Sequence, residues 1–387
     1  MGATTPTTLE QIDAAWLTAA LVESGTLASG TMIERIEQVR LGEGEGFMGE
    51  IARLGLTYRS GSGPASLVAK VPTTDDGNRA TGRSLGIYER EVRAYDTLLA
   101  SIDVPHPRAH VATYEARGDE ADLLAQMIKA ERLPLWLLRR LVRRQQTDAE
   151  VPPCVLVLDD LDTLSMGDQV AGCDPERAAA ALTVAARLHA STWGERLPAE
   201  RHWFVGGDAV PRLFHAVYLD NRRSFERRIK PVFRPAVYEL ARSVRRSGLD
   251  RIRRLHAGAP RCLLHGDFRL DNLFFDDAGR VASVIDWQSV NHGPAVLDVA
   301  YFITGSLDPT TPEPVIDDLL AAYHGALVEA GGVGYSLEHL RADYDEALLL
   351  LLHRMSGLDT LEFGDDRGVD LIELWLRRFD ARLARLV

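Results

Sequence analysis

Lysine is scarce in this sequence of 387 residues, which contains only Lys70, Lys129 and Lys230. The formal net charge is −12, so the chain as a whole has no excess of positive charge. Proteins that bind a nucleic-acid backbone need clustered lysine and arginine to neutralise its phosphates. The charge balance therefore argues against a nucleic-acid-binding protein.

Cysteine and long apolar runs are also lacking. Cys154, Cys173 and Cys262 lie far apart without a CxxC pair, which excludes both a disulfide-stapled secreted domain and a cysteine zinc site. No stretch reaches the ~18 apolar residues of a membrane span, and the N-terminus lacks the features of a signal peptide. We therefore expect a cytoplasmic protein without integral membrane association.

The composition that remains is that of an ordinary globular protein, with 46% hydrophobic and 26% charged residues. The length favours two or three domains. Near the N-terminus, Thr7 or Thr8 is a candidate N-cap, and apolar residues follow at helical spacing. We expect a leading helix that ends near Gly25.

A glycine-rich motif follows this helix, with Gly44, Gly46 and Gly49 in the pattern G-x-G-x-x-G. The pattern occurs in dinucleotide-binding Rossmann units and also over the ATP phosphates of kinases. A Rossmann loop runs directly into a helix. Here the residues after the loop, 50–58, alternate with a period of two, and a turn cluster and the strand-like segment 67–72 follow. This order predicts an antiparallel sheet and disfavours the Rossmann unit.

The strand after the turn cluster places Lys70 on the same face as Val68, the side over which the glycine loop can fold. A solvated edge charge is the simplest alternative for a lone strand lysine. In kinases, a strand lysine pairs with a helical glutamate. Downstream, residues 84–101 form an amphipathic helical pattern that contains Glu91 and Glu89. Glu91 is the first candidate for the partner and Glu89 the second, unless both are surface charges.

The segment 261–290, RCLLHGDFRLDNLFFDDAGRVASVIDWQSV, carries the most specific pattern. Two apolar strands flank a DDAGR turn, so a hairpin returns Asp286 to the neighbourhood of Asn272. Their oxygen atoms suit Mg²⁺. Asp267 would orient an acceptor hydroxyl and accept its proton, while His265 would hold the loop in place. Zinc on His265 and Asp267 is disfavoured, because no second histidine or cysteine stands at ligand spacing.

Several motifs together resemble those of one superfamily. They are GEGFMGE, SLVAKVP, EREVRAY, CVLVLDDL, ARLHASTW, LLHGDFRLDNLFF, VIDWQ and GPAVLDVAYF, between residues 42 and 303. The sequence resembles the aminoglycoside phosphotransferase and choline kinase-like superfamily, and within it the ecdysteroid kinase-like branch. The resemblance implies an α+β, two-lobed protein-kinase-like fold, with a small antiparallel-sheet N-lobe and a larger, mainly helical C-lobe.

The resemblance also assigns roles. It implies Lys70 on the nucleotide phosphates with Glu91 as its partner, Asp267 as the catalytic base, and Asn272 and Asp286 on Mg²⁺. ATP would further contact the glycine loop and the backbone of a hinge strand, at Gly44, Gly46, Gly49, Leu158, Asp159 and Asp160. The apolar alternation of the hinge segment VLVLDDL is equally typical of a core strand without a role in binding. Asp298 would be a structural aspartate that ties the catalytic loop.

The predicted domains follow from these assignments. Residues 1–157 form the nucleotide-binding lobe, 158–161 the hinge, and 162–387 the catalytic and substrate-binding lobe, with ATP in the cleft between them. Residues 121–150 have helical periodicity, many arginines and Trp136, and we expect a helical insertion of the first lobe there. It would cover the cleft or contact another subunit, and a peripheral membrane role is the weaker alternative.

The expected activity is phosphoryl transfer from ATP to a hydroxyl of a small molecule. Residues 357–373 are rich in Asp and Glu, as suits a polycationic aminoglycoside-like sugar, although solvated surface explains them equally well. The branch resemblance instead suggests a neutral alcohol such as a steroid, polyol or other natural product. A catalytically silent nucleotide-binding regulator is the alternative function, and the chain could be a monomer or a homodimer.

Overall fold

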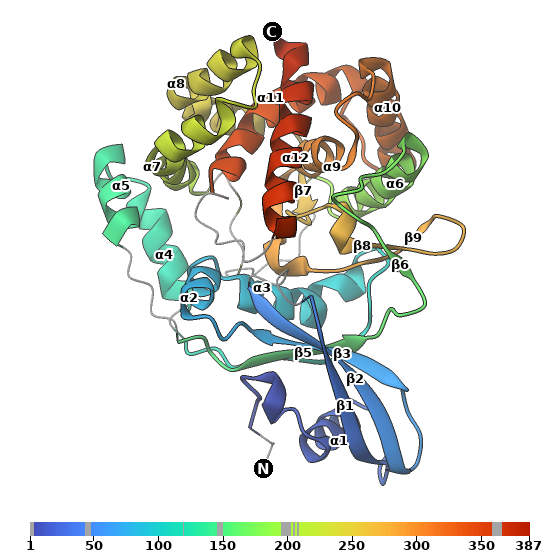
Figure 1. Ribbon diagram of the computed structural model, residues 1–387. Coiled ribbons are helices and arrows are strands. Elements are labelled where there is room, and N and C mark those ends of the chain that lie inside the picture. Colours follow the sequence, from blue (N-terminus) through green and yellow to red (C-terminus); the bar gives the residue numbers. More distant parts are fainter. Residues whose placement is uncertain are drawn as a thin grey trace. The chain divides into compact units, whose positions relative to one another are not determined.

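The computed structural model forms two compact units. It describes residues 4–42, 48–118, 120–144, 150–194, 203, 206, 209–357 and 366–387. The first unit contains residues 1–101, 106–120 and 146–163, and the second contains 102–105, 121–145 and 164–387. Figure 1 labels the elements of both units along the chain.

The first unit is built on a five-stranded antiparallel sheet in the order β1-β2-β3-β5-β4. The strands are β1 Met32–Leu41, β2 Gly49–Ser60, β3 Ser66–Pro72, β4 Ala109–Tyr114 and β5 Cys154–Asp159. In β3, Leu67 and Ala69 are fully buried, whereas Lys70 lies on the other face. The antiparallel sheet and the two faces of β3 agree with the period of two in the sequence.

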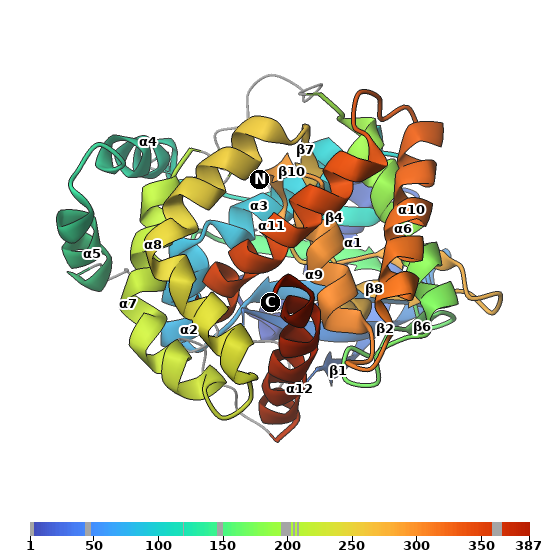
Figure 2. The same ribbon diagram turned by 90° about the horizontal axis from the view of Figure 1, so that it is seen from above.

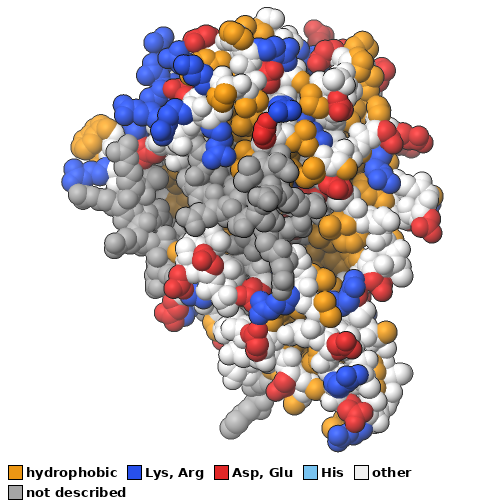
Figure 3. Space-filling model, viewed as in Figure 1, with side chains coloured by type: hydrophobic (Ala, Val, Ile, Leu, Met, Phe, Trp, Pro, Cys, Tyr) orange, Lys and Arg blue, Asp and Glu red, His pale blue; other side chains and the backbone are white. Residues whose placement is uncertain are grey.

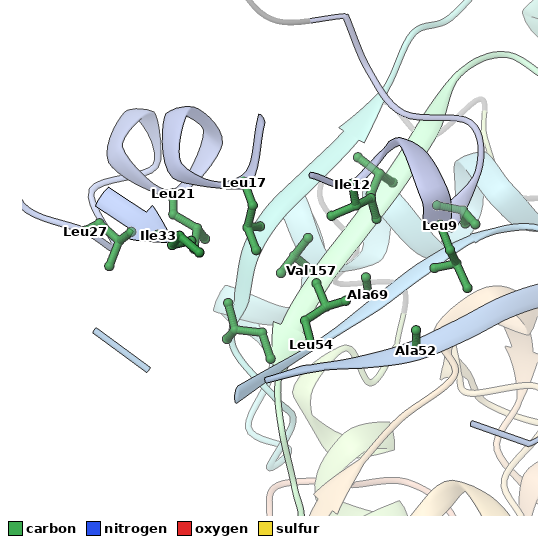
Figure 4. Close-up of a cluster of buried hydrophobic side chains, with 13 residues drawn as sticks. Leu9, Ile12, Leu17, Leu21, Leu27, Ile33, Ala52, Leu54, Ala69 and Val157 are labelled. Atoms are coloured by element: carbon green, nitrogen blue, oxygen red, sulfur yellow. The ribbon is translucent and has the colours of Figure 1, made fainter. Parts of the chain in front are cut away.

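One face of this sheet is covered by the N-terminal segment. Leu17 and Leu21 of helix α1, Ala14–Glu23, pack with Leu54 and Val157 of the strands in a cluster of fully buried side chains (Figure 4). Burying such a leucine contributes about 2 kcal/mol relative to leaving it in water. Lys70 lies on the other face of the sheet, which α1 does not cover.

Helix α1 begins later than the sequence predicted. Its N-cap is Asp13, whose carboxylate accepts a hydrogen bond of 2.7 Å from the backbone nitrogen of Trp16. Thr8 instead precedes a short 3₁₀ turn, Leu9–Gln11, and makes no capping bond with its side chain. An aspartate at the N-cap also places negative charge at the positive end of the helix, which explains why Asp13 and not Thr7 or Thr8 starts it.

The first unit also contains two helices that follow β3 in the chain. They are α2, Asp76–Ser84, and α3, Ile87–Arg93. Gly86 joins them with a φ of 65°, in the left-handed region that glycine adopts without steric cost. The turn sets the direction of α3, on which Glu89 and Glu91 are both buried.

The second unit is mainly helical. Its long helices are α6 Pro175–Ser191, α7 Pro211–Ile229, α8 Pro235–Gly258, α9 Val296–Ser306, α10 Glu313–Glu329, α11 Leu337–Gly357 and α12 Asp366–Leu383 (Figure 2). Helix α11 packs against α7, α8 and α9. Of the helices that the structure describes, none is long and apolar enough to span a membrane.

Short strands flank the H-G-D segment in this unit. Strand β7, Arg261–Leu264, pairs with β10, Asn291–Pro294, and β8, Leu273–Phe275, pairs with both β6, Ser165–Met166, and β9, Val281–Val284. The antiparallel pair of β8 and β9 confirms the predicted hairpin.

The segment expected as an insertion forms two helices, α4, Glu120–Ala130, and α5, Leu135–Arg144, and it belongs to the second unit. Its polar contacts explain this placement. Arg139 pairs with Asp220 of α7 at 2.7 Å. The Glu131 carboxylate accepts hydrogen bonds from the backbone nitrogens at positions 212 and 213, so it caps the first turn of α7. Trp136 is 66% exposed.

A glycine lets α8 approach α11. A Cβ atom on Gly248 would lie 2.5 Å from Cε1 of His353, so we expect Gly248→Ala to destabilise the protein by about 1–3 kcal/mol. Gly325 of α10 is the control, because a Cβ atom there meets nothing within 4 Å. Gly325→Ala should stabilise the protein by up to about 1 kcal/mol. Chemical denaturation measures both, and equal effects would contradict the packing.

The same contact predicts a pH dependence. Nε2 of His353 lies 3.1 Å from Nδ1 of His215. Burial, followed by the charge that His215 can carry, lowers the pKa of His353 to about 3. The unfolded chain binds a proton on His353 below about pH 6.5 and the folded chain does not, so stability falls as the pH is lowered from 6.5 toward 3.

We expect His353 to contribute a loss of about 1 kcal/mol per pH unit in that range. Unfolding free energies of wild type and His353→Gln between pH 7 and 4.5 test this. The variant should have the shallower slope, and parallel curves would show that His353 titrates normally.

Candidate active site

A buried aspartate anchors the loop that carries the candidate base. The Asp298 carboxylate, in the first turn of α9, accepts hydrogen bonds from the backbone nitrogens of His265 at 2.7 Å and Gly266 at 3.0 Å. Nε2 of His189 lies 3.3 Å from the same carboxylate. Asp298 is only 2% exposed, and hydrogen bonds to a buried charge are about twice as strong as neutral ones. The predicted structural role of Asp298 is confirmed.

The loop needs a glycine next to this anchor. Gly266 has a φ of 77°, and any side chain there would collide with the backbone oxygen of Ser289. The His265 ring, which is fully buried, donates from Nε2 to the Ile285 oxygen at 2.9 Å and accepts at Nδ1 from the Asp267 nitrogen at 3.2 Å. His265 therefore ties the base to the strand that precedes Asp286, as a scaffold residue would.

Four side chains surround the Asp267 carboxylate. Oδ1 accepts from the Tyr301 hydroxyl at 2.9 Å and from Nη2 of Arg354 at 2.6 Å. Oδ2 accepts from Nδ2 of Asn272 at 3.2 Å and lies 3.5 Å from Nε of Arg269. Burial opposes ionisation of this carboxyl group, but the two guanidinium groups outweigh it and hold its pKa below the usual range. Asp267 is therefore ionised at neutral pH.

Tyr301 and Arg354 were not identified from the sequence. Burial raises the pKa of Tyr301, so its hydroxyl stays protonated and can donate. The Arg354 guanidinium lies 4.1 Å from the centre of the Tyr301 ring and also donates to the Gly266 oxygen. Tyr301 stands three positions after Asp298 on one helix, so helical spacing could have revealed it. Arg354 lies on α11, and no local pattern connects it with Asp267.

The candidate metal ligands lie next to the base. Nδ2 of Asn272 donates to the backbone oxygen of Asp267 at 2.8 Å as well as to its carboxylate, which leaves Oδ1 of Asn272 as an acceptor. The backbone nitrogen of Ile285 donates a hydrogen bond of 3.0 Å to the backbone oxygen of Asn272. Asp286 is the next residue after Ile285, so this bond brings its backbone close to that of Asn272. An amide oxygen and a carboxylate form a donor set that fits Mg²⁺.

Asp286 has an unusual backbone. Its φ is 63°, and it is the one non-glycine residue with positive φ in the described part of the chain. Such a conformation costs about 1–2 kcal/mol for most residues and is concentrated at functional sites. Nε2 of Gln288 donates to its Oδ2 at 3.0 Å. The local strain directs the Asp286 side chain and supports a functional position.

The first unit holds the candidate phosphate-binding residues. Nζ of Lys70 lies 2.7 Å from Oε1 of Glu91, and both side chains are largely buried. Oε1 of Glu89 instead lies 3.7 Å from Nε of Arg93. The structure therefore contains Glu91, the first candidate, as the partner of Lys70. A Cβ atom on Gly49 would lie 3.2 Å from Cε of Lys70, so this glycine leaves room for the lysine stem. Gly44 and Gly46 lie outside the described residues.

The predicted hinge residues have structural partners. Leu158 is 8% exposed in β5. The Asp159 carboxylate accepts from the Arg108 nitrogen at 2.9 Å and from Nε2 of His110 at 2.8 Å, and Asp160 pairs with Arg53 at 2.7 Å. Because both carboxylates are engaged within the first unit, any contact with adenine would fall to the backbone of this segment.

An antiparallel-sheet unit with a lysine–glutamate pair and a helical unit with an H-G-D loop define the two-lobed, protein-kinase-like α+β fold that was predicted. The chain belongs to the ecdysteroid kinase-like family, whose family model matches residues 43–332. This membership supports a small-molecule phosphotransferase of the kinase-like class. No curated protein matches the sequence significantly.

A solved structure shows the same fold at low identity. A Ralstonia eutropha protein provisionally described as an aminoglycoside phosphotransferase is 14% identical with a TM-score of 0.51, and the match covers 95% of this chain and 98% of that one. The choline kinase LicA from Streptococcus pneumoniae is 13% identical with a TM-score of 0.42, over 90% and 93% of the two chains. At 14% identity, the similarity to the Ralstonia eutropha protein concerns the fold alone.

The positive φ of Asp286 predicts that a glycine variant is more stable than an alanine variant at this position, the reverse of the usual order. Both Asp286→Gly and Asp286→Ala remove the carboxylate, but only glycine adopts positive φ freely, so the glycine variant should be more stable by about 1 kcal/mol. The control is the same pair at Asp277, an exposed turn residue, where alanine should be at least as stable. Thermal unfolding measures the four variants, and a more stable Asp286→Ala would contradict the strained backbone.

Proposed function

We propose that the protein is an ATP- and Mg²⁺-dependent phosphotransferase that moves the γ-phosphate to a hydroxyl group of a small molecule. The observation that carries this proposal is the ionised Asp267 carboxylate, which lies on an anchored loop and accepts a hydrogen bond from Asn272. The β8–β9 hairpin connects Asn272 to Asp286. The pair of Lys70 and Glu91 in the first unit supports it independently.

Asp267 is the proposed catalytic base. Its carboxylate would accept a hydrogen bond from the acceptor hydroxyl, orient it for attack, and take the proton as the phosphoryl group transfers. Because its pKa is low, Asp267 is a weak base in the ground state and accepts the proton only when the hydroxyl oxygen has begun to bond to phosphorus. General base catalysis of this kind contributes about 10²–10⁴-fold to the rate.

The remaining residues would position the phosphates. Oδ1 of Asn272 and the Asp286 carboxylate would hold Mg²⁺, which when bound neutralises charge on the phosphate oxygens. Lys70 would bind the phosphates through its ammonium group. Glu91, 2.7 Å away, holds that ammonium group in a fixed direction, so less entropy is lost when ATP binds.

The charges around the base favour a particular acceptor. Arg354 and Arg269 both lie beside the Asp267 carboxylate, and Arg354 is 39% exposed on its side chain. An ammonium group next to the acceptor hydroxyl would lie close to the exposed guanidinium group of Arg354, which is unfavourable although Arg354 also pairs with Asp267. We therefore propose a neutral alcohol, of the steroid, polyol or other natural-product type. The acidic stretch that suggested a cationic sugar lies largely outside the described residues.

We expect Asp267→Asn to lower kcat by about 10²–10⁴-fold in a protein that is still folded, because the amide orients a hydroxyl but accepts no proton. Asp277→Asn, in the exposed turn, is the control and should keep full activity. The measurement is ATP consumption against neutral alcohols and cationic sugars, with mass spectrometry for the phosphorylated product.

The outcomes separate the alternatives. Turnover of neutral alcohols by wild type alone supports the proposal, whereas a preference for cationic sugars would contradict the acceptor class and leave phosphoryl transfer intact. If wild type binds ATP and phosphorylates nothing, the silent nucleotide-binding regulator is the better description.

A further inference from the structure

Positive charge is concentrated on two neighbouring helices of the second unit. Residues 211–258, which include α7 and α8, contain 13 Lys or Arg and 4 Asp or Glu, although the whole chain has a net charge of −12. Figure 3 shows these basic side chains gathered at the upper left, where Figure 1 labels α7 and α8. A local excess of this kind attracts anions even on an acidic protein.

The basic side chains line a groove. Its volume is about 760 Å³, and its walls come from α5, α7 and α8. The lining residues are Arg139, Leu219, Asp220, Arg222, Arg223, Arg245 and Arg246. The volume lies within the range of small-molecule sites, which is roughly 300–1,000 Å³. The groove therefore has the size of a binding site for one small ligand.

Two of the five arginines are neutralised within the protein. Arg139 pairs with Asp220 at 2.7 Å and Arg222 pairs with Glu226 at 3.0 Å. In the described part of the chain, no carboxylate lies within ion-pair distance of Arg223, Arg245 or Arg246. Three uncompensated charges of one sign in a single groove repel each other and add nothing to stability. They complement a ligand that carries about three negative charges.

The chemistry of the lining narrows the ligand class. A guanidinium group is planar and donates two parallel hydrogen bonds to a phosphate. Single-stranded nucleic acid binds through aromatic side chains on which its bases stack, and the lining residues include none. From the volume, the three uncompensated charges and the arginine-rich lining, we propose that this groove binds a ligand with two or more phosphate groups. A free polyphosphate compound and a phosphorylated lipid headgroup share this chemistry.

The proposed groove is separate from the phosphotransfer residues. The described hydrogen-bond partners of the Asp267 carboxylate are Asn272, Tyr301 and Arg354, none of which lines the groove, and Lys70 belongs to the other unit. Binding in the groove can therefore be measured whether or not the protein transfers phosphate.

The test uses inorganic tripolyphosphate as the probe and isothermal titration calorimetry at 0.15 M salt. The groove variant is Arg245→Glu with Arg246→Glu. The matched control is Arg253→Glu with Arg254→Glu, which makes the same charge change at exposed positions of the same helix outside the groove. Lys70→Ala reports on binding at the proposed nucleotide site. Melting temperatures establish that each variant is folded.

We expect wild type to bind tripolyphosphate, the groove variant to lose at least 10-fold in affinity, and the control to change by less than 3-fold, and the same loss from the groove substitutions should remain when they are made in Lys70→Ala. A second arm measures sedimentation with phosphatidylcholine vesicles that contain a phosphoinositide. Groove-dependent binding to these vesicles without binding of free tripolyphosphate identifies the lipid headgroup as the source and supports the site.

Three results would overturn the inference. Equal losses in the groove variant and the control would show general electrostatic attraction. A loss confined to Lys70→Ala would place the probe at the nucleotide site. Absence of wild-type binding in both arms at millimolar probe would show that the arginines bind no phosphate ligand.

Discussion

The loop that carries the proposed base depends on one buried carboxylate. The Asp298 carboxylate accepts hydrogen bonds from the backbone nitrogens of His265 and Gly266. These bonds fix a turn at Gly266, where any other residue would collide with the backbone of Ser289. The turn places Asp267 against Asn272, and the His265 ring ties it to the strand that leads to Asp286. An unpaired carboxylate at the position of Asp298 would carry a large desolvation cost, so the loop and its anchor are stable only together.

The sequence predicted those features that rest on local patterns. The antiparallel sheet and the buried face of β3 follow from a period of two, and the hairpin of β8 and β9 follows from its turn residues. The pairing of Lys70 with Glu91 was predicted from the kinase pattern of a strand lysine and a helical glutamate, and the structure contains this pair, whereas Glu89 lies near Arg93.

Other features depend on packing between distant segments and had no local signal. Arg354 reaches Asp267 across 87 positions, and Glu131 attaches α4 and α5 to the second unit by capping α7. At the N-terminus, a stronger cap at Asp13 overrode Thr7 and Thr8. Net charge was similarly incomplete as a guide, because a sum of −12 conceals both the guanidinium groups around the base and the basic groove.

The central claim is that one anchored loop and its hairpin present two oxygen ligands beside the base. A crystal structure with Mn²⁺ and a non-hydrolysable ATP analogue, with anomalous data for manganese, tests this most directly. The account predicts a manganese peak bound by Oδ1 of Asn272 and the Asp286 carboxylate, with the phosphates on the same ion. A manganese ion bound without Asn272 and Asp286, with the analogue ordered elsewhere, would contradict it.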